Sequence, residues 1–198
     1  MVMKKTLVIA ALVAASSGAW ASSIFSDNFN GDTIAANTTP SGWSVGSGTV
    51  DVVGPGWFGN LCAATGGSCV DLDGSTNRAG TLSKSFSLLA GNTYTASFDL
   101  AGNQRGGSDV VDIAFGGSLS TLSLTSSAAW ATYSLTFAPT TSGNYTLSFH
   151  NRGGDNVGAV LDNVNVSVAA AVPEPESYAM LLAGLGLMGV AARRRNKR

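Results

Sequence analysis

Three segments of the chain alternate strictly between apolar and polar residues. Apolar side chains occupy every second position in residues 94–100, 133–137 and 145–149, and the positions between them hold Thr, Ser or Asp. Because successive side chains of a strand point to opposite faces, each segment predicts a β-strand with one buried and one solvated face. In this register His150, the only histidine, falls on the solvated face of its strand.

Further short strands are expected between turn-forming pairs such as Asp73-Gly74, Gly116-Gly117 and Gly153-Gly154. These strands are predicted at residues 69–72, 81–88, 110–115, 119–124 and 160–168. No helical periodicity precedes Pro173. The pattern predicts an all-β fold, an antiparallel β-sandwich of the jelly-roll type, flanked by an N-terminal signal helix and a C-terminal apolar helix.

The N-terminal segment has the three-part pattern of a secretory signal peptide. Two lysines precede an apolar run at residues 7–15, and a small-residue segment ends at Ala19-Trp20-Ala21. This order predicts that the Sec machinery exports the chain and that signal peptidase cleaves after Ala21, with Ala19 and Ala21 as the small residues of the cleavage site. The apolar run is shorter than the roughly 20 residues that a membrane span needs.

Residues 22–172, between the signal peptide and the C-terminal tail, are expected to form a single acidic domain. This segment is long enough to bury one hydrophobic core. It holds four Lys or Arg and ten Asp without any Glu, so its formal charge is −6, against −1 for the whole chain. Four scattered cations give no electrostatic surface for nucleic acid, which excludes nucleic-acid binding.

The two cysteines, Cys62 and Cys69, flank a Gly-containing turn in the exported part of the chain. An oxidising compartment favours a disulfide between them, worth about 2–3 kcal/mol in the chain-entropy description. A metal site would need further ligands at suitable spacing, and none are nearby.

Candidate catalytic residues are few, and we expect no enzyme. His150 has no evident partner for acid–base catalysis. A glycoside hydrolase would need two carboxylates, for which Asp71 with Asp73 or Asp109 with Asp112 are available. Ordinary aspartates of strands and turns explain the same residues, and we favour that interpretation.

Aromatic residues near turns are the better candidates for ligand binding. Trp43, Trp57, Phe58 and Trp130 lie in or beside predicted turns. Such rings either stack on the apolar faces of sugars or close the ends of the sandwich as core residues. Both interpretations stay open for Trp43, Trp57 and Trp130.

Parts of the domain resemble galactose-binding-like jelly rolls, a group that includes many carbohydrate-binding modules. The segment Phe25–Gly31, with Trp43 downstream, resembles the first end of that fold, and Gly158–Val166 resembles the last. Phe98–Gly106 is similar to exported domains that recur with interchangeable C-terminal anchors. The resemblance implies the jelly-roll fold and an extracellular polysaccharide as a candidate ligand.

Asp162 is the residue of the final predicted strand that most needs a partner. In a regular strand it would point to the same face as the valines of residues 160–168, which are expected to be buried. A buried carboxylate must be paired, hydrogen-bonded or bound to a cation. The resemblance implies a structural calcium held by Asp162 together with Asp27, Asn28 or Asp32. Two alternatives are a bulge that turns the carboxylate to solvent, and an ion pair with Arg105 or Arg152.

The C-terminal segment, residues 173–198, is similar throughout to the PEP-CTERM sorting signal read by exosortase, a membrane transpeptidase of polysaccharide-producing Gram-negative bacteria. Pro173-Glu174-Pro175 is followed by an uncharged stretch, residues 178–192, and then by five cations in residues 193–198. The prolines favour an extended backbone that a protease-like cleft can bind. As a helix the uncharged stretch would be roughly 22 Å long, marginal for a bilayer core of about 30 Å. A permanent membrane anchor is the alternative.

These features predict an exported protein that the C-terminal helix anchors transiently in the membrane before exosortase processing delivers it to the cell surface or extracellular space. Three functions fit such a protein. The first is a non-catalytic module in the exopolysaccharide layer of a biofilm, with polysaccharide as ligand. The second is a structural or adhesive matrix protein without a defined ligand. The third, a secreted hydrolase, is disfavoured by the lack of a catalytic constellation.

Overall fold

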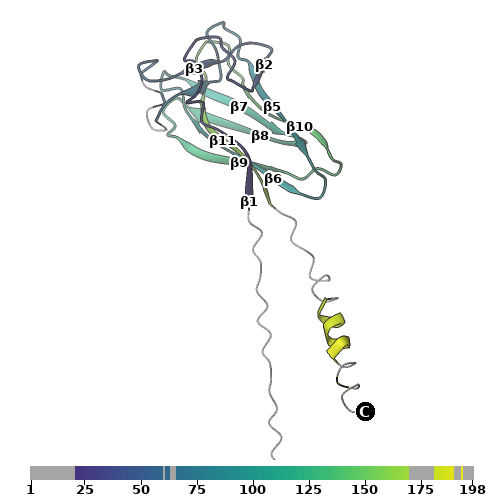
Figure 1. Ribbon diagram of the computed structural model, residues 1–198. Coiled ribbons are helices and arrows are strands. Elements are labelled where there is room, and N and C mark those ends of the chain that lie inside the picture. The colour runs from purple at the N-terminus through teal and green to yellow at the C-terminus, as the bar shows by residue number, and fades with distance from the viewer. Residues whose placement is uncertain (1–20, 60, 63–65, 170–180, 190–192, 194–198) are drawn as a thin grey trace, which may run out of the picture. The chain divides into compact units, whose positions relative to one another are not determined.

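The computed structural model describes residues 21–59, 61–62, 66–169, 181–189 and 193. Its strands form two layers (Figure 1). In chain order they are β1 (Ala21–Asp27), β2 (Ser44–Gly46), β3 (Asp51–Val53), β4 (Cys69–Asp71), β5 (Thr81–Leu88), β6 (Thr93–Ala101), β7 (Ser108–Phe115), β8 (Ser118–Thr125), β9 (Ala131–Phe137), β10 (Gly143–Asn151) and β11 (Val160–Ala169).

The two sheets pack as an antiparallel sandwich. One sheet has the order β3-β4-β11-β6-β9, and β1 also pairs with β11. The other sheet has the order β2-β5-β10-β7-β8. All of these strand pairs are antiparallel. The predicted all-β sandwich is confirmed.

Alternation of side chains accounts for the strands that the sequence predicted. In β6 the apolar residues at 94, 96, 98 and 100 are buried, and the polar residues at 95, 97 and 99 are half-buried. The predicted segment 81–88 forms β5 in full. The sequence did not indicate β1, β2 or β3 as strands. β2 and β3 have three residues each, too few to show a period, whereas the equally short β4 was predicted because Asp73-Gly74 marks a turn after it.

The main core between the sheets is built around packed aromatic rings. Phe149 of β10 meets Phe98 of β6 edge to face, with ring centroids 4.9 Å apart. Trp43 lies 6.3 Å from Phe149 and also contacts Phe25 and Phe29. Edge-to-face pairs of this kind add to the burial energy of each ring.

A second apolar cluster contains the disulfide. Cys62 and Cys69 are bonded, with their Cα atoms 5.6 Å apart, which confirms the predicted pair. The cluster also contains Val160, whereas the next residue, Leu161, belongs to the main core. Because neighbouring strand residues face opposite sides, the second cluster covers the outer face of the six-stranded sheet.

Replacing both cysteines with serine is expected to lower the free energy of unfolding by about 2–3 kcal/mol, because the unfolded chain loses a constraint on its entropy. Denaturant unfolding of the oxidised domain measures the change. Wild-type domain in the presence of a reductant should show the same lower midpoint. An unchanged midpoint in both samples would contradict a stabilising role of the Cys62–Cys69 bond.

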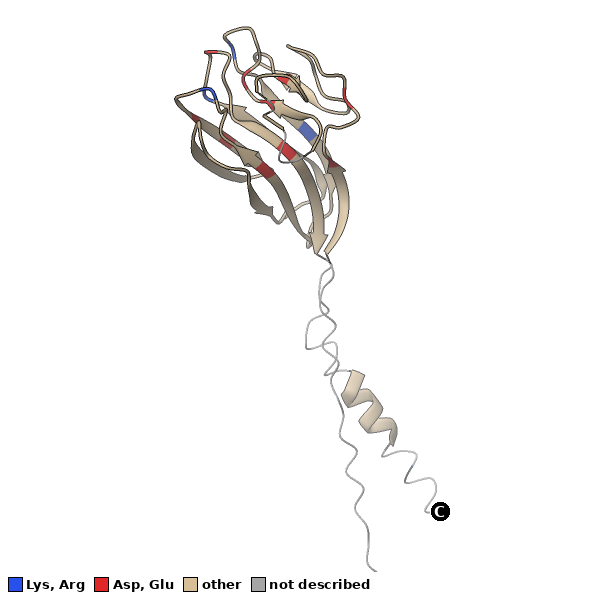
Figure 2. Ribbon diagram, turned by 90° about the vertical axis from the view of Figure 1, so that its left-hand side faces the viewer, with Lys and Arg blue, Asp and Glu red and all other residues tan. Residues whose placement is uncertain are grey.

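Charged residues are unevenly placed along the sandwich. The red ribbon positions of Asp residues in Figure 2 lie away from the end where the strands converge. Asp71 ends β4, Asp99 is near the end of β6, and Asp109 and Asp162 are near the starts of β7 and β11. We call the end marked by these Asp residues, with the connecting segments 72–80, 102–107 and 152–159, the loop end. The other end of the sandwich contains Ala21 and Ala169, which pair between β1 and β11.

The C-terminal segment is described only in part. Residues 181–189 form a helix whose leucines are exposed. Over the described ranges, no helix is both long and apolar enough to cross a membrane. Residues 1–20, including Ala19, and the motif Pro173-Glu174-Pro175 lie outside the described residues. The signal helix and its cleavage after Ala21 therefore stay predictions.

Candidate functional site

A polar sheet face is the first candidate for a binding site. On β10, Leu147 and Phe149 point into the core, so Ser148 and His150 point outward from the five-stranded sheet. On the neighbouring β7, Val111 and Ile113 are buried and Asp112 points outward. The pairing of His150 with Asp112 places these outward side chains next to each other. The solvated register that the sequence predicted for His150 is thus observed.

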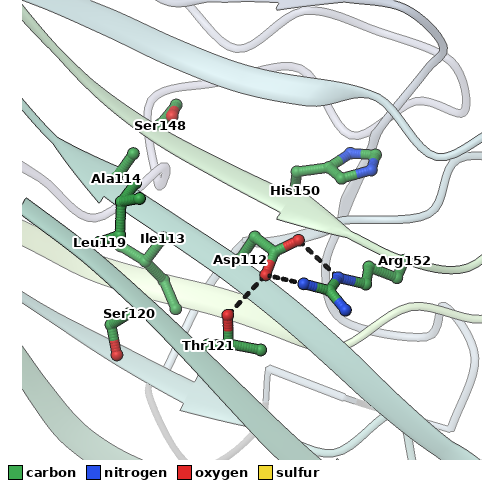
Figure 3. A pocket seen from close by; sticks show the side chains of 9 residues that line it. All are labelled: Asp112, Ile113, Ala114, Leu119, Ser120, Thr121, Ser148, His150 and Arg152. Atoms are coloured by element: carbon green, nitrogen blue, oxygen red, sulfur yellow. Dashed lines mark hydrogen bonds and ion pairs between the residues drawn. The ribbon is translucent and has the colours of Figure 1, made fainter.

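The outer face holds a shallow pocket of about 360 Å³ (Figure 3). Strands β7, β8 and β10 form its floor, and Arg152 closes one side just after β10. The lining residues are Asp112, Ile113, Ala114, Leu119, Ser120, Thr121, Ser148, His150 and Arg152.

A bidentate ion pair is the main polar feature of the pocket. Arg152 Nε donates to Asp112 Oδ2 at 2.6 Å, and Arg152 Nη2 donates to Asp112 Oδ1 at 2.8 Å. Thr121 Oγ1 donates to the same Oδ1 at 2.7 Å. These hydrogen bonds, those from Arg152 foremost, lower the pKa of Asp112, so the carboxylate is ionised at neutral pH.

The histidine of the pocket contacts β5 and the residue before it. Its Nδ1 lies 3.3 Å from the carbonyl oxygen of Gly80 and 3.4 Å from Thr81 Oγ1. Neither is a carboxylate that could orient the ring for acid–base catalysis. Of the nine lining residues, Asp112 is the one acid. The arrangement therefore suits hydrogen bonding of a ligand better than bond cleavage.

The two carboxylate pairs considered for glycoside hydrolysis do not form a cleft. Asp109 shares the inward register of β7 and is 5% exposed, whereas Asp112 points outward from the same strand. Asp71 and Asp73 are fully buried. Two carboxylates that flank a glycosidic bond must both reach it from one open site, which neither pair does.

The aromatic candidates divide into one core residue and a group at the second cluster. Trp43 is 7% exposed, and its indole N–H donates to Asp27 Oδ2 at 2.8 Å, so of the two interpretations that the sequence left open the structure favours a core residue. Trp57 and Trp130 are half-buried against the second cluster. Phe58 is 41% exposed, and the guanidinium of Arg105 lies 4.6 Å from its ring centroid.

The candidate calcium ligands are placed as follows. Asp27 accepts hydrogen bonds from Trp43 and from the backbone N–H of Phe29, and Asp32 accepts one from the N–H of Ser41. Asp162 is 2% exposed and accepts a hydrogen bond from the N–H of Asn163. Across the described ranges, no group of three His, Cys, Asp or Glu side chains is placed to bind a metal ion.

The prediction that Asp162 faces the same side as Val164 and Val166 is wrong, because β11 contains a bulge between them. The register with β6 shifts between Asp162 and Asn165, and Asn163 has a φ of 50°. Leu161 and Val164 both belong to the main core, so Asp162 faces away from it, on the side of Val160. The bulge does not expose the carboxylate to solvent. The expected cations pair elsewhere, Arg105 with Asp71 and Arg152 with Asp112.

Sequence reasoning missed the buried pair of Arg105 with Asp71. Asp71 Oδ1 also accepts hydrogen bonds from the N–H groups of Gly158 at 3.0 Å and Asp73 at 3.1 Å. Burial raises the pKa of Asp71 to about 7, because desolvation outweighs the attraction of Arg105. The pocket residues Thr121 and Arg152 were missed as well. Their only signal was alternation: Arg152 follows His150 by two residues, and Thr121 falls at an exposed position of β8.

Several solved structures share this fold. The xylan-binding CBM22-1 domain of Paenibacillus barcinonensis Xyn10C has 16% identity and a TM-score of 0.54, over 80% of this chain and all of that domain. The tandem CBM22-1–CBM22-2 domain of the same protein has 16% identity and a TM-score of 0.56, over 81% of this chain and 49% of the tandem. The C-terminal family 22 carbohydrate-binding module of Clostridium thermocellum Xyn10B has 13% identity and a TM-score of 0.50, over 80% of this chain and 99% of that module.

The protein is therefore a β-sandwich with the architecture of family 22 carbohydrate-binding modules, a likeness that at these identities concerns the fold alone. Residues 18–167 match DUF642, described as a protein of unknown function, and the chain belongs to this family. Residues 171–195 match the PEP-CTERM protein-sorting motif, which confirms the resemblance of the tail. The sequence matches no curated protein.

Proposed function

We propose that this protein is an exported, non-catalytic module that binds polysaccharide in the exopolysaccharide layer. The binding site is the pocket on the outer face of the five-stranded sheet. The observation that carries the proposal is the Asp112 carboxylate, held by Arg152 and Thr121 beside Ser148 and His150 in one open pocket.

The chemistry of the pocket suits a sugar chain. Carbohydrate hydroxyls both donate and accept hydrogen bonds, and a bidentate pair of guanidinium and carboxylate supplies donors and acceptors side by side. Leu119 is 79% exposed at the pocket and offers an apolar contact for the C–H groups of a sugar ring. A shallow site on a sheet face can also bind an internal segment of a polymer, because the chain can extend beyond the pocket in both directions.

The C-terminal tail supports the location. A PEP-CTERM motif implies an exported protein with a membrane-anchoring segment near its C-terminus. In our proposal an exosortase-type transpeptidase acts at Pro173-Glu174-Pro175 and delivers the domain to the polysaccharide-rich surface. Export itself proceeds through the Sec machinery, and signal peptidase removes residues 1–21.

Replacing Asp112 with alanine is expected to weaken polysaccharide binding at least about 10-fold, because hydrogen bonds to charged groups contribute about 1.5–3 kcal/mol each. Affinity electrophoresis of residues 22–172 through gels containing xylan, or exopolysaccharide from a producing strain, measures the effect. The variant should keep its thermal midpoint, since exposed ion pairs contribute little to stability.

Asp99→Ala is the matched control. Asp99 is also a partly exposed carboxylate that accepts from a threonine hydroxyl, Thr132 Oγ1 at 2.6 Å, but it lies on the six-stranded sheet. The control should bind like the wild type. An equal loss of polysaccharide affinity in both variants would show that the binding site is not the pocket.

The alternative function is a structural or adhesive matrix protein without a defined ligand. The absence of an aromatic residue from the lining of the pocket favours this alternative, because many sugar-binding sites use aromatic stacking. It predicts that the wild-type domain migrates identically in gels with and without every polysaccharide tested.

A further inference from the structure

The end of the sandwich opposite the loop end is built from uncharged segments. Strand ends and turns form it, at residues 21–24, 86–95, 115–118, 136–146 and 166–169. We call it the exit end, because β11, the last strand, ends there. These described segments contain no Asp, Glu, Lys or Arg, and Figure 2 shows neither red nor blue ribbon where the strands converge. A partner can therefore cover the exit end without removing an ion from water.

Two exposed aliphatic side chains lie at the exit end. Ile24 of β1 is 45% exposed, and Leu89, just after β5, is 61% exposed. Both line a shallow pocket of about 510 Å³, to which Phe86 and Val168 add apolar surface and Asn92 adds an amide. Apolar groups beside uncharged polar groups match the boundary between lipid hydrocarbon and water.

Hydrogen bonds fix the turn that carries Leu89. The Leu89 backbone N–H donates to the Tyr94 hydroxyl at 2.9 Å, and the Ala90 N–H donates to Ser142 Oγ at 3.0 Å. Tyr94 is 4% exposed, so the turn is held against the core. Backbone pairing of β1 with β11 holds the strand that carries Ile24. Because both side chains stand on fixed backbone, a partner does not have to offset the entropy of ordering that backbone.

The chain continues from the exit end into the sorting tail over a short distance. Eight residues, 170–177, separate Ala169 from the uncharged stretch at residues 178–192. Even a fully extended segment of this length spans only roughly 30 Å. A tail anchored in the membrane, as the PEP-CTERM motif implies, therefore keeps the exit end within that distance of the bilayer. Such a short tether raises the effective concentration of the bilayer surface, so a small apolar contact suffices for docking.

We propose that the exit end docks on the membrane surface while the tail is anchored, with Ile24 and Leu89 inserted at the lipid boundary. The acidic loop end then points away from the bilayer, where anionic headgroups do not repel its carboxylates. Once the tail is removed, the apolar contact is too small to hold the domain on the membrane. Docking is independent of the polysaccharide site, because the two pockets share no residue.

The test uses residues 22–198, inserted from detergent into preformed vesicles of phosphatidylethanolamine and phosphatidylglycerol. Both native cysteines are in the Cys62–Cys69 disulfide, so one introduced cysteine can be labelled alone. A fluorescent label at Ala90→Cys reports on the exit end, and a label at Ser108→Cys, which is also exposed, reports on the loop end. Brominated lipids quench only a label that reaches the bilayer. We expect quenching at position 90 and none at position 108.

Replacing Ile24 and Leu89 together with serine, in the Ala90→Cys chain, should lower the ratio of docked to undocked domain roughly 10-fold, because less aliphatic surface leaves water on docking. The double variant should still float with the vesicles through its tail. Phe58→Ala is the matched control, since Phe58 is 41% exposed but contacts Arg105 of the loop end, and it should leave the quenching unchanged. Residues 22–172 without the tail should not float with the vesicles.

A label at position 90 that brominated lipids do not quench, or equal quenching at positions 90 and 108, would overturn the proposal. Quenching in the double serine variant as strong as in its parent chain would overturn it as well. A label whose emission shifts with the protein density of the vesicles, without quenching by brominated lipid, would assign the exit end to a second copy of this chain instead.

Discussion

Replacing Phe149 with alanine is expected to lower the free energy of unfolding by about 3–5 kcal/mol. The ring is fully buried, packs edge to face on Phe98, and contacts Trp43. Its removal leaves a cavity between the central strands of both sheets, which the neighbouring rings cannot fill without leaving their own contacts. Domains of this size have about 5–15 kcal/mol of stability in total, so the variant is expected to be near its unfolding threshold.

Denaturant unfolding of residues 22–172 measures the loss. Phe58→Ala is the matched control, because it removes the same ring from a position that is 41% exposed and should cost far less. Since β10 carries Ser148 and His150 on its other face, Phe149→Ala should also weaken polysaccharide binding in proportion to the unfolded fraction. Equal midpoints for the two variants would mean that the core is not organised around Phe149.

Replacing Pro173, Glu174 and Pro175 together with alanine is expected to abolish sorting, so that the full-length protein remains in the membrane fraction. The motif is the part of the tail that a transpeptidase would bind as an extended segment, since proline disfavours helix for itself and the residue before it. The apolar stretch and its flanking cations would be unchanged and would still hold the chain.

Mass spectrometry of surface-extracted protein from a host with the sorting enzyme is the measurement. Wild-type protein should lack residues 178–198, and the triple variant should retain them in the membrane. Deleting residues 193–198 is a useful comparison, because cations that flank an apolar span favour its retention, and their loss should weaken membrane retention without changing the motif. A wild-type surface protein whose mass still includes residues 178–198 would establish a permanent anchor.

Regular alternation made the long strands predictable. The segment 81–88 was predicted with the bounds that β5 has, because turn residues flank an uninterrupted strand. The outward position of His150 followed from the same period. Strands β2 and β3 were invisible because each is three residues long and is defined by its pairing with β5 or β4.

The site was less predictable because it depends on contacts distant in sequence. A single bulge at Asn163 reversed the expected direction of Asp162, and a period alone cannot indicate a bulge. Trp43 lies beside a turn yet packs inward, since Asp27 satisfies its indole N–H. Asp73 and Asn151 approach the same residue, Gly153, only through folding, because Asp73 follows β4 and Asn151 ends β10, strands of different sheets.

The position of β11 determines how the domain would carry a mechanical load. This strand is flanked along its length, by β6 on one side and by β4 and then β1 on the other. A pull applied at Ala169 along the strand axis runs across the hydrogen bonds of both ladders and loads them together, instead of opening them one at a time. A domain that is tethered at its C-terminal end and binds a polymer through β7 and β10 would therefore be loaded in shear. The aromatic core would transmit the force between β11 and the five-stranded sheet that carries the binding site.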